Sequence, residues 1–168
     1  MASEGYPMTS VAERIEPEAL FDWFVAQRRD MGLDIVPLGG DSGATLLKVL
    51  RSGGLVGLLC DRDIIGTGVK VELFGEMTTL PAGPATLVLR TGATLLVGAV
   101  YSGPGRDHSA VITEPVDTSR TGSFRKDVER ITQDIARQFE AIIRRAPEQW
   151  HLYQPNWPSD VVDEPPDA

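Results

Sequence analysis

An uninterrupted apolar segment, Leu55–Cys60, limits the possible folds more than any other part of this chain. Strands that are covered by helices on both faces form continuous apolar runs, whereas half-exposed strands alternate apolar and polar residues. The segment is too short for a membrane span or a typical helix. We therefore expect residues 55–60 to form a buried parallel strand that ends abruptly at Asp61–Asp63.

The rest of the chain alternates between helical and extended patterns. Short strands are expected at 6–11, 33–38, 69–74, 94–101 and 110–113, the last of these antiparallel to its predecessor. Helices are expected at 17–29, at 44–51, after the prolines of 81–84, and at 123–145. The alternation predicts an α/β fold with a mostly parallel sheet flanked by helices. Because the first strand begins within a few residues of Met1, the sheet resembles an incomplete domain.

Composition excludes several classes of function. The net charge of −8 and the pI near 4.7 disfavour nonspecific binding of nucleic acid. A single cysteine, Cys60, excludes an internal disulfide and a multi-cysteine zinc site, and fits a reducing compartment. The only two histidines, His108 and His151, limit the general bases available near neutral pH. We expect Cys60 to be a core residue and His108 to be exposed in a loop.

Asp61 is the most prominent candidate for chemistry, because it is the first polar residue after the expected buried strand. Open α/β sheets place ligands and catalytic groups at the carboxyl ends of their parallel strands. The alternative is that Asp61 and Asp63 only form a turn, since Asp side chains often accept hydrogen bonds from nearby backbone N–H groups.

Several motifs, in a fixed order, resemble the lipid A biosynthesis acyltransferase superfamily, with most likeness to its phosphatidylinositol mannoside acyltransferases. The resemblance covers about residues 6–158, and its order and spacing are more specific than any single motif. It is seen in Thr9–Arg14, Pro17–Phe21, Asp61–Asp63, Gly66–Glu76, Thr79–Pro84, Thr91–Ala93, Trp150–Pro155 and Trp157.

The resemblance implies transfer of a fatty acyl group from acyl-CoA to a mannose hydroxyl of a phosphatidylinositol mannoside, with no metal and no cofactor besides the acyl-CoA co-substrate. A histidine of a His-X4-Asp/Glu motif would take the hydroxyl proton as general base. Asp61 aligns with the acidic residue that orients and supports this histidine. Arg14, Arg62 and Asp63 are candidate substrate-binding residues. Guanidinium groups suit phosphates of coenzyme A or the lipid head, although a surface ion pair of Arg14 with Glu13 or Glu18 is the alternative.

The chain departs from this family pattern in one respect: it contains no His-X4-Asp/Glu motif. We therefore interpret residues 1–158 as the C-terminal part of an acyltransferase domain and the acidic residues 159–168 as a disordered tail. We expect a separate N-terminal half as a partner. The chain by itself is expected to lack acyltransferase activity.

The resemblance also implies a peripheral location on the cytoplasmic face of the cell membrane. No apolar run of the sequence is long enough to span a bilayer. The expected helix 123–145 presents an apolar stripe that would cover the sheet. Its polar faces hold six basic residues that could meet anionic lipid heads: Arg125, Lys126, Arg130, Arg137, Arg144 and Arg145. Trp150, Tyr153 and Trp157 would suit the membrane interface.

Two other classes of function remain open. An apolar strand followed by Asp61 and Asp63 is also typical of metal-dependent phosphatases and of some nucleotide-sugar enzymes. The phosphatase pattern is poorly matched at Ile65, and the chain offers few lysines for it. The third reading is a noncatalytic fragment whose exposed apolar surface would cause association.

Overall fold

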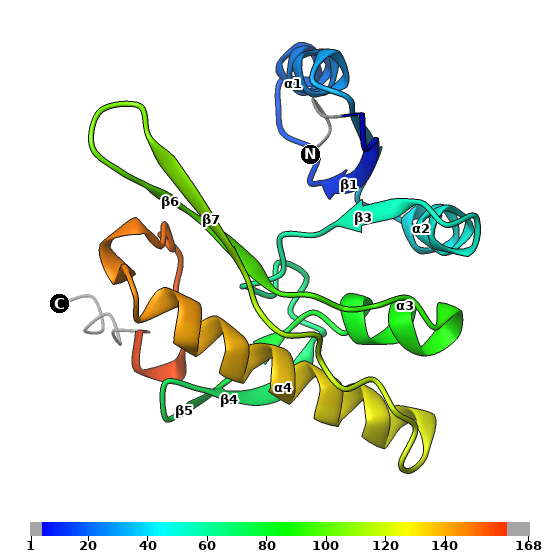
Figure 1. Ribbon diagram of the computed structural model, residues 1–168, viewed down its shortest axis with the longest axis vertical. Coiled ribbons are helices and arrows are strands. Elements are labelled where there is room, and N and C mark those ends of the chain that lie inside the picture. The colour runs from blue at the N-terminus through cyan, green and yellow to red at the C-terminus, as the bar shows by residue number, and fades with distance from the viewer. Residues whose placement is uncertain (1–4, 161–168) are drawn as a thin grey trace, which may run out of the picture. The chain divides into compact units, whose positions relative to one another are not determined.

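A computed structural model of the chain describes residues 5–160, and its backbone separates into two units. The first unit comprises Met1–Leu59 and Arg90–Ala93. The second comprises Cys60–Leu89 and Thr94–Ala168. Figure 1 shows the elements of both units in chain order. The candidate site residues are therefore divided, with Arg14 in the first unit and Asp61, Arg62 and Asp63 in the second.

The first unit is a small parallel sheet with two helices. Its elements are β1 (Met8–Ala12), α1 (Glu18–Asp30), β2 (Leu33–Pro37), α2 (Ser42–Arg51) and β3 (Leu55–Gly57). The strand order is β2-β1-β3, and Met8 pairs in parallel with Leu33 on one side and with Leu55 on the other. The predicted α/β class, with a parallel sheet flanked by helices, is confirmed in this unit.

The topology of this sheet reverses direction at β1. The chain passes from β1 through α1 to β2, and then returns through α2 to β3 on the other side of β1. Such a reversal creates a switch point between β1 and β3, which is where open α/β sheets tend to bind ligands. Gly32 follows the end of α1 with a positive φ of 82°, which a residue with a side chain rarely adopts.

The prediction of a six-residue buried strand at Leu55–Cys60 is wrong in length and burial. β3 covers only Leu55–Gly57, and it lies at an edge of the described sheet. The Leu55 side chain is 40% exposed and that of Leu59 is 92% exposed. An apolar run shows that side chains favour burial, but it does not show which partner covers them. Among residues 5–160, Leu59 is left almost fully uncovered and Leu55 is covered only in part.

The second unit contains two antiparallel hairpins, two helices and two short 3-10 turns. These are β4 (Val69–Leu73), β5 (Glu76–Leu80), α3 (Gly83–Thr91), β6 (Gly98–Ser102), β7 (His108–Ile112), α4 (Phe124–Ile143), η2 (Pro147–Gln149) and η3 (Pro158–Asp160). The last two residues of α3 belong to the first unit.

β4 alternates as its sequence predicts, whereas the partner strand β5 was not predicted. Val71 and Leu73 are fully buried, and the intervening Glu72 is exposed. Phe74 and Gly75 connect the two strands with positive φ values of 56° and 84°. Two positive φ values are the signature of a tight hairpin turn, but a Phe-Gly pair is an unusual sequence for it.

The second hairpin confirms the predicted antiparallel return but corrects its first strand. β6 begins at Gly98 rather than Thr94, and it pairs with β7 through Gly98 and Ile112 at one end. One face is exposed, since the Val100 side chain is 69% accessible while Tyr101 is buried. The apolar composition of 94–101 did not reveal this exposure.

α4 packs against β4 and supplies much of the core of the second unit (Figure 1). Ser123 caps its N-terminus by accepting a hydrogen bond from the backbone N–H of Lys126. The five residues whose spacing predicts the apolar stripe are all buried: Val128, Ile131, Ile135, Phe139 and Ile142. The stripe thus covers the protein core, as expected for an amphipathic helix.

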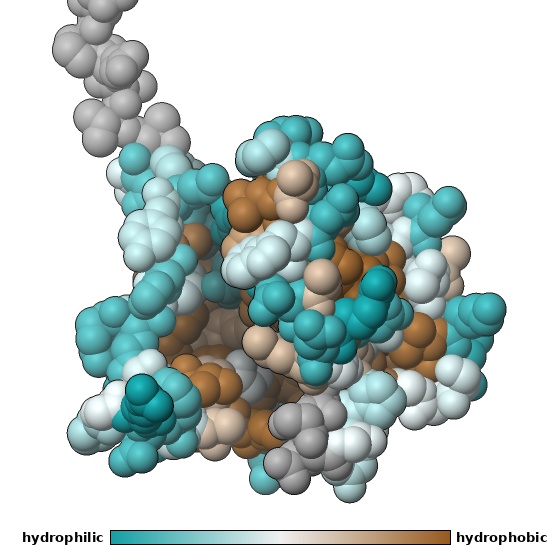
Figure 2. All heavy atoms as spheres, turned by 90° about the horizontal axis from the view of Figure 1, so that it is seen from above, coloured by the Kyte–Doolittle hydropathy of each residue, from teal (hydrophilic) through white to brown (hydrophobic). Residues whose placement is uncertain are grey.

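Apolar side chains also remain on the surface, where Figure 2 shows hydrophobic patches among polar ones. In the first unit, Trp23 is 55% and Met31 is 60% exposed. None of the helices within residues 5–160 is both long and apolar enough to cross a membrane. Of the predicted tail, the structure describes Ser159 and Asp160, which lie in η3, and residues 161–168 lie outside the described residues.

Candidate functional site

Asp61 follows the end of β3 by four residues, in a segment without regular secondary structure. Its side chain is half-buried, and one carboxylate oxygen, Oδ2, accepts a hydrogen bond from the indole Nε1 of Trp150 at 2.8 Å. A hydrogen bond to a charged acceptor is stronger than one between neutral groups. The carboxylate of Asp61 is therefore tied to a segment 89 residues later in the chain.

The indole that holds Asp61 packs against two other aromatic rings. The rings of Phe74, Trp150 and Trp157 have centroids 6.0 to 6.3 Å apart, with tilted or edge-to-face geometry. Nε1 of Trp157 donates to the carbonyl oxygen of Leu73 at 3.1 Å. The guanidinium of Arg144 lies 5.1 Å from the centre of the Phe74 ring. We call the three rings the aromatic cluster.

Arg62 is half-buried beside Asp61, and it contacts the same later segment. Its Nη1 donates a hydrogen bond to Oε1 of Gln154, four residues after Trp150. Two consecutive residues of the candidate site are thus held by one short stretch, Trp150–Gln154. The prediction that Arg62 meets a substrate phosphate remains untested.

Asp63 makes the contacts of a turn-forming carboxylate. Its Oδ1 accepts from the backbone N–H of Gly66 at 3.0 Å, and its Oδ2 accepts from that of Gly68 at 2.6 Å. A Cβ atom at Gly68 would lie 2.4 Å from the carbonyl oxygen of Leu80 and 2.7 Å from Oδ2 of Asp63. The loop 64–68 therefore depends on the Asp63 carboxylate and on the absence of a side chain at Gly68.

Arg14 lies in the first unit, two residues beyond the end of β1 at the switch point of the sheet. Its Nη1 is 4.0 Å from Oε1 of Glu18, and its guanidinium is 5.5 Å from the ring centre of Phe21. Both side chains of the ion pair are well exposed, so the pair contributes little to stability. The pair of Arg14 with Glu18 is one of the two surface ion pairs that we expected as the alternative role of Arg14. Binding of a phosphate by Arg14 stays a prediction.

The cysteine is poorly suited to nucleophilic chemistry, and both histidines are exposed. Burial raises the pKa of the Cys60 thiol to about 12, and the negative charge of Asp61 adds to the effect. A thiol with so high a pKa is almost entirely protonated near neutral pH, and is unreactive. His108 is exposed at the start of β7, and His151 is exposed 6.0 Å from the ring of Tyr153.

No metal-binding constellation is found in the described part of the chain. Within residues 5–160, no group of three or more His, Cys, Asp or Glu side chains could hold a metal ion. The carboxylates of Asp61 and Asp63 instead accept from different protein donors, an indole and two backbone amides. This geometry gives no support to the alternative of a metal-dependent phosphatase or nucleotide-sugar enzyme.

The basic residues of α4 are largely paired within the helix. Ion pairs three or four residues apart join Arg125 to Glu129, Arg130 and Arg137 to Asp134, and Arg144 to Glu140. These acidic partners reduce the positive field that would attract anionic lipid. Of the three aromatic residues predicted for a membrane interface, Trp150 and Trp157 are half-buried in the aromatic cluster, whereas Tyr153 is 88% exposed.

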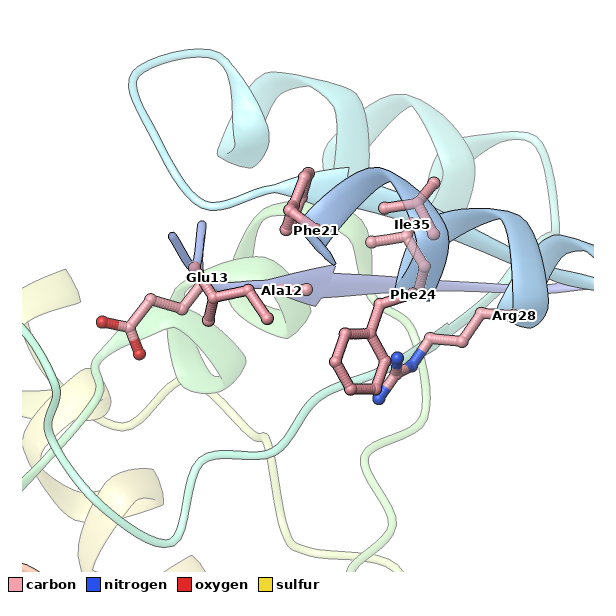
Figure 3. Close-up of a pocket in the computed structure, with 8 residues that line it drawn as sticks. Ala12, Glu13, Phe21, Phe24, Arg28 and Ile35 are labelled. Carbon is pink, nitrogen blue, oxygen red and sulfur yellow. The ribbon is translucent and has the colours of Figure 1, made fainter. Parts of the chain in front are cut away.

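The surface has a hollow in each unit. In the first, a groove of about 160 Å³ between α1 and the sheet is mainly apolar, and Figure 3 shows the Arg28 guanidinium beside the Phe24 ring. Their separation is 5.1 Å from the guanidinium carbon to the ring centre. In the second, a wider hollow near the start of α4 includes Lys70 and Arg125. None of the four predicted site residues lines either hollow.

Sequence reasoning missed Trp150 and Gln154 as partners of the candidate site. Both lie in Trp150–Pro155, a motif that contributes to the family resemblance but is rich in aromatic residues. Aromatic residues near a chain end suggest core packing or an interface. The pairing of the motif with Asp61–Asp63 depends on the fold, because local spacing contains no information about it.

Comparison with known proteins agrees with the resemblance in the sequence. The chain matches the family described as bacterial lipid A biosynthesis acyltransferase over residues 1–159. It is 38% identical over 162 residues to a phosphatidylinositol mannoside acyltransferase of Mycolicibacterium smegmatis, covering 94% of this chain and 51% of the relative. Proteins of the same name from two Mycobacterium tuberculosis strains are 36% identical, with 92% of this chain and 48% of the relatives covered.

The chain thus spans about half the length of the curated relatives it matches. The family match nevertheless includes β1 and the Asp61–Asp63 segment, and it continues through α4 to the stretch that holds Asp61 and Arg62. The chain belongs to the bacterial lipid A biosynthesis acyltransferase family.

Proposed function

We propose that this protein takes part in transferring a fatty acyl group from acyl-CoA to a mannose hydroxyl of a phosphatidylinositol mannoside. The single observation that supports this best is the identity of 36 to 38% to phosphatidylinositol mannoside acyltransferases over more than nine tenths of the chain. The acceptor class comes from the names of these relatives, and acyl-CoA is the donor that the family resemblance implies.

The proposed reaction is a substitution at a thioester. The acceptor hydroxyl oxygen bonds to the acyl carbonyl carbon, the C–S bond breaks, and coenzyme A leaves as a thiolate. A histidine takes the hydroxyl proton as general base and passes it to the thiolate. Asp61 would orient this histidine and stabilise its positive charge. The printed sequence has no His-X4-Asp/Glu motif, so we propose that a second polypeptide segment supplies the histidine.

The other candidate residues fit this reaction to different degrees. Arg62 neighbours Asp61 and offers a guanidinium for a phosphate of coenzyme A or of the lipid head. Arg14 offers another at the switch point of the first unit. Asp63, with both oxygens occupied by backbone N–H groups, is better suited to shaping the loop 64–68 than to touching substrate.

Exposed apolar surface supports the need for a second segment. Leu20 and Trp23 on α1 are 40% and 55% exposed, and Leu59, the last residue of the first unit's main segment, is 92% exposed. Large apolar side chains exposed in this way are typical of an interface with protein or membrane. The alternative of a noncatalytic fragment, which would only complete an enzyme together with another polypeptide, would bind that polypeptide through the same exposed side chains.

We further propose that the reaction takes place at the cytoplasmic face of the cell membrane, where the lipid acceptor would be anchored. The ion pairs of α4 argue that its arginines contribute modestly to lipid binding. Sedimentation with anionic vesicles tests this location. Arg144→Glu with Arg145→Glu should weaken binding if α4 meets the lipid, whereas unchanged sedimentation would show that another surface does so.

Acyl transfer from labelled acyl-CoA to phosphatidylinositol mannoside vesicles tests the proposed function. The chain is assayed alone and together with the part of the Mycolicibacterium smegmatis relative that it does not match. We expect no transfer by the chain alone and measurable transfer by the pair. Each component alone and a pair with a heat-denatured partner serve as controls.

Two outcomes would contradict this account. Transfer at enzyme-like rates by the chain alone would show that no second segment is needed. A pair that forms a stable complex but transfers no acyl group would remove the proposed activity. Complex formation, followed by size-exclusion chromatography, separates this second case from a simple failure to associate.

A further inference from the structure

The segment that follows α4 is attached along the candidate site and the first hairpin of the second unit. We define it as the C-terminal strap, Trp150–Asp160. The Oγ1 hydroxyl of Thr78 donates to the backbone carbonyl of Asn156, and the Ser159 hydroxyl donates to Oε2 of Glu76 at 2.7 Å. These contacts attach the C-terminal part of the strap to β5. Its N-terminal residue, Trp150, is thereby held in place beside Asp61.

The strap contacts two consecutive residues of the candidate site: the Trp150 indole donates to Oδ2 of Asp61, and Oε1 of Gln154 accepts from the Arg62 guanidinium. The indole N–H is a donor without any acceptor capacity. It can therefore hold a carboxylate oxygen without competing for a proton. Its bond involves Oδ2 of Asp61, and Oδ1 has no part in it.

The direction of the Trp150 N–H is itself fixed by packing. The indole ring meets Phe74 at a 6.0 Å centroid distance, and it meets Trp157 at 6.0 Å and an interplanar angle of 83°. Phe74 is at the turn of the first hairpin, and Trp157 is anchored to the Leu73 carbonyl. Rotation of the Trp150 ring would disrupt these contacts, so the indole is a rigid donor.

From this geometry we propose that Trp150 is a positioning residue, which fixes the Asp61 carboxylate so that its other oxygen can meet the histidine of the active site. The proposal rests on the proposed function, in which Asp61 orients the general base. Carboxylates that orient a catalytic histidine must present one oxygen in a constant direction, and small displacements at such sites lower rates strongly. Trp150 would act through Asp61 without touching substrate.

Indole N–H resonances test the contact in the full 168-residue chain. The chain has three tryptophans, and Trp→Phe variants assign their three signals. We expect Asp61→Ala to move the Trp150 indole proton upfield, because its hydrogen bond to the carboxylate is lost. Asp61→Asn is a second variant, which keeps the test informative if Asp61→Ala disturbs folding. It retains an acceptor oxygen, so it should shift the Trp150 indole proton less than Asp61→Ala does. A Trp150 signal that responds to neither variant would overturn the proposal.

A double-mutant cycle in acyl transfer tests the positioning role. In the chain paired with the unmatched part of the relative, Trp150→Phe should lower kcat roughly 10- to 100-fold with little change in KM. Added to Asp61→Ala, it should cause no further loss, since both changes remove one interaction. Tyr101→Phe is the matched control. It also removes a buried side-chain hydrogen bond of an aromatic residue in the second unit, the one from the Tyr101 hydroxyl to the Ile142 carbonyl, and it should change kcat less than about threefold on either background.

Additive losses from Trp150→Phe and Asp61→Ala would show that Trp150 only stabilises the fold, and this would overturn the positioning role. Equal losses from Trp150→Phe and the control Tyr101→Phe would do the same. If the wild-type pair transfers no acyl group at all, the proposed function fails, and the positioning role fails with it. The indole resonances then still decide whether Trp150 holds Asp61.

Discussion

Asp63 and Gly68 together build the loop that follows the candidate site. The Asp63 carboxylate accepts hydrogen bonds from the backbone N–H groups of Gly66 and Gly68. The backbone of Gly68 lies close to the Leu80 carbonyl. The turn-forming alternative offered by the sequence therefore describes Asp63 well. Asp61, only two residues earlier, faces an indole instead of the local backbone.

Replacing Gly68 with alanine should destabilise the second unit. The added Cβ would lie 2.4 Å from a backbone oxygen that cannot move without distorting β5. Crowding of this kind typically lowers the free energy of unfolding by about 1–3 kcal/mol. Urea denaturation of the wild type and the variant, followed by tryptophan fluorescence, measures the difference.

Gly83→Ala is a matched control for this change. Gly83 begins α3, and a Cβ there would meet no atom within 4 Å. Alanine favours a helix over glycine by about 1 kcal/mol, so this variant should be neutral or slightly more stable. Equal stability of the two variants would show that the close approach at Gly68 is unimportant.

The identity of the candidate site residue was accessible from the sequence, but its partners were not. Asp61 stands out because it ends an apolar run in a family motif. Trp150 lies 89 residues away, and its indole reaches Asp61 only because α4 and the strap fold back over the first hairpin. Hydrogen bonds between distant segments depend on tertiary packing, about which local periodicity contains no information.

At the scale of elements, α4 shows how well periodicity predicts a long amphipathic helix. Its five expected apolar positions are buried, and its N-terminus is capped by Ser123. The sequence did not predict a second feature of α4, a buried carboxylate near its N-terminus. The buried Asp127 side chain accepts hydrogen bonds from Thr121 and Gly122, which closes the loop that precedes the helix.

Asp127 should make the stability of the protein depend on pH in the acidic range. Backbone hydrogen bonding from Thr121, aided by its hydroxyl and by Gly122, lowers the pKa of Asp127 below its ordinary value of 3.8. A lowered pKa stabilises the fold above the unfolded-state value, and this contribution is lost as pH falls through the folded-state pKa. Asp127→Asn keeps an acceptor oxygen but has no charge to lose.

Urea unfolding at several pH values tests this prediction. Asp127→Asn should be less stable than the wild type at neutral pH, and the difference should narrow as pH falls below 3.8. Asp22→Asn, at an exposed position of α1, is the control and should stay close to the wild type throughout. A difference for Asp127→Asn that is constant across pH would contradict the role of its charge.

The strands were predicted less well than the helices, for identifiable reasons. A strand is recognised by a short pattern, and its burial depends on neighbours that the pattern does not specify. Leu55–Cys60 has an apolar composition but contributes only a three-residue strand at a sheet edge. β5 was missed because Phe74–Gly75 lacks the Asn-Gly or Asp-Gly signal of a tight turn.

At the scale of the whole molecule, exposed apolar side chains are the main departure from an ordinary soluble surface. Leu20 and Trp23 lie on one helix, and Met31 follows at its end, with exposures of 40 to 60%. Scattered apolar residues are normal, but neighbouring ones on a helix mark an interaction surface. This surface is consistent with the proposal that a second segment completes the site.

The isolated chain should associate with itself in a concentration-dependent way. Sedimentation velocity at increasing protein concentration should show species larger than the 18.2 kDa monomer. Leu20→Ser with Trp23→Ser should reduce this association, whereas Arg29→Ser on the same helix should not. A wild-type chain that remains monomeric at all concentrations would contradict the assignment of α1 as an interaction surface.

The central claim is that Asp61 supports acyl transfer once a second segment supplies the general base. The most direct measurement is kcat for transfer from acyl-CoA to phosphatidylinositol mannoside by the chain paired with the unmatched part of the Mycolicibacterium smegmatis relative. It is made for the wild type, for Asp61→Asn, and for Asp134→Asn as a control on the outer side of α4.

We predict that Asp61→Asn lowers kcat by about 100-fold, since an amide cannot stabilise the histidinium that forms in the reaction. Asp134→Asn changes a carboxylate to an amide in helix-surface ion pairs, and it should leave kcat within about threefold of the wild type. Equal rates for the wild type and Asp61→Asn, in complexes that form equally well, would contradict the account.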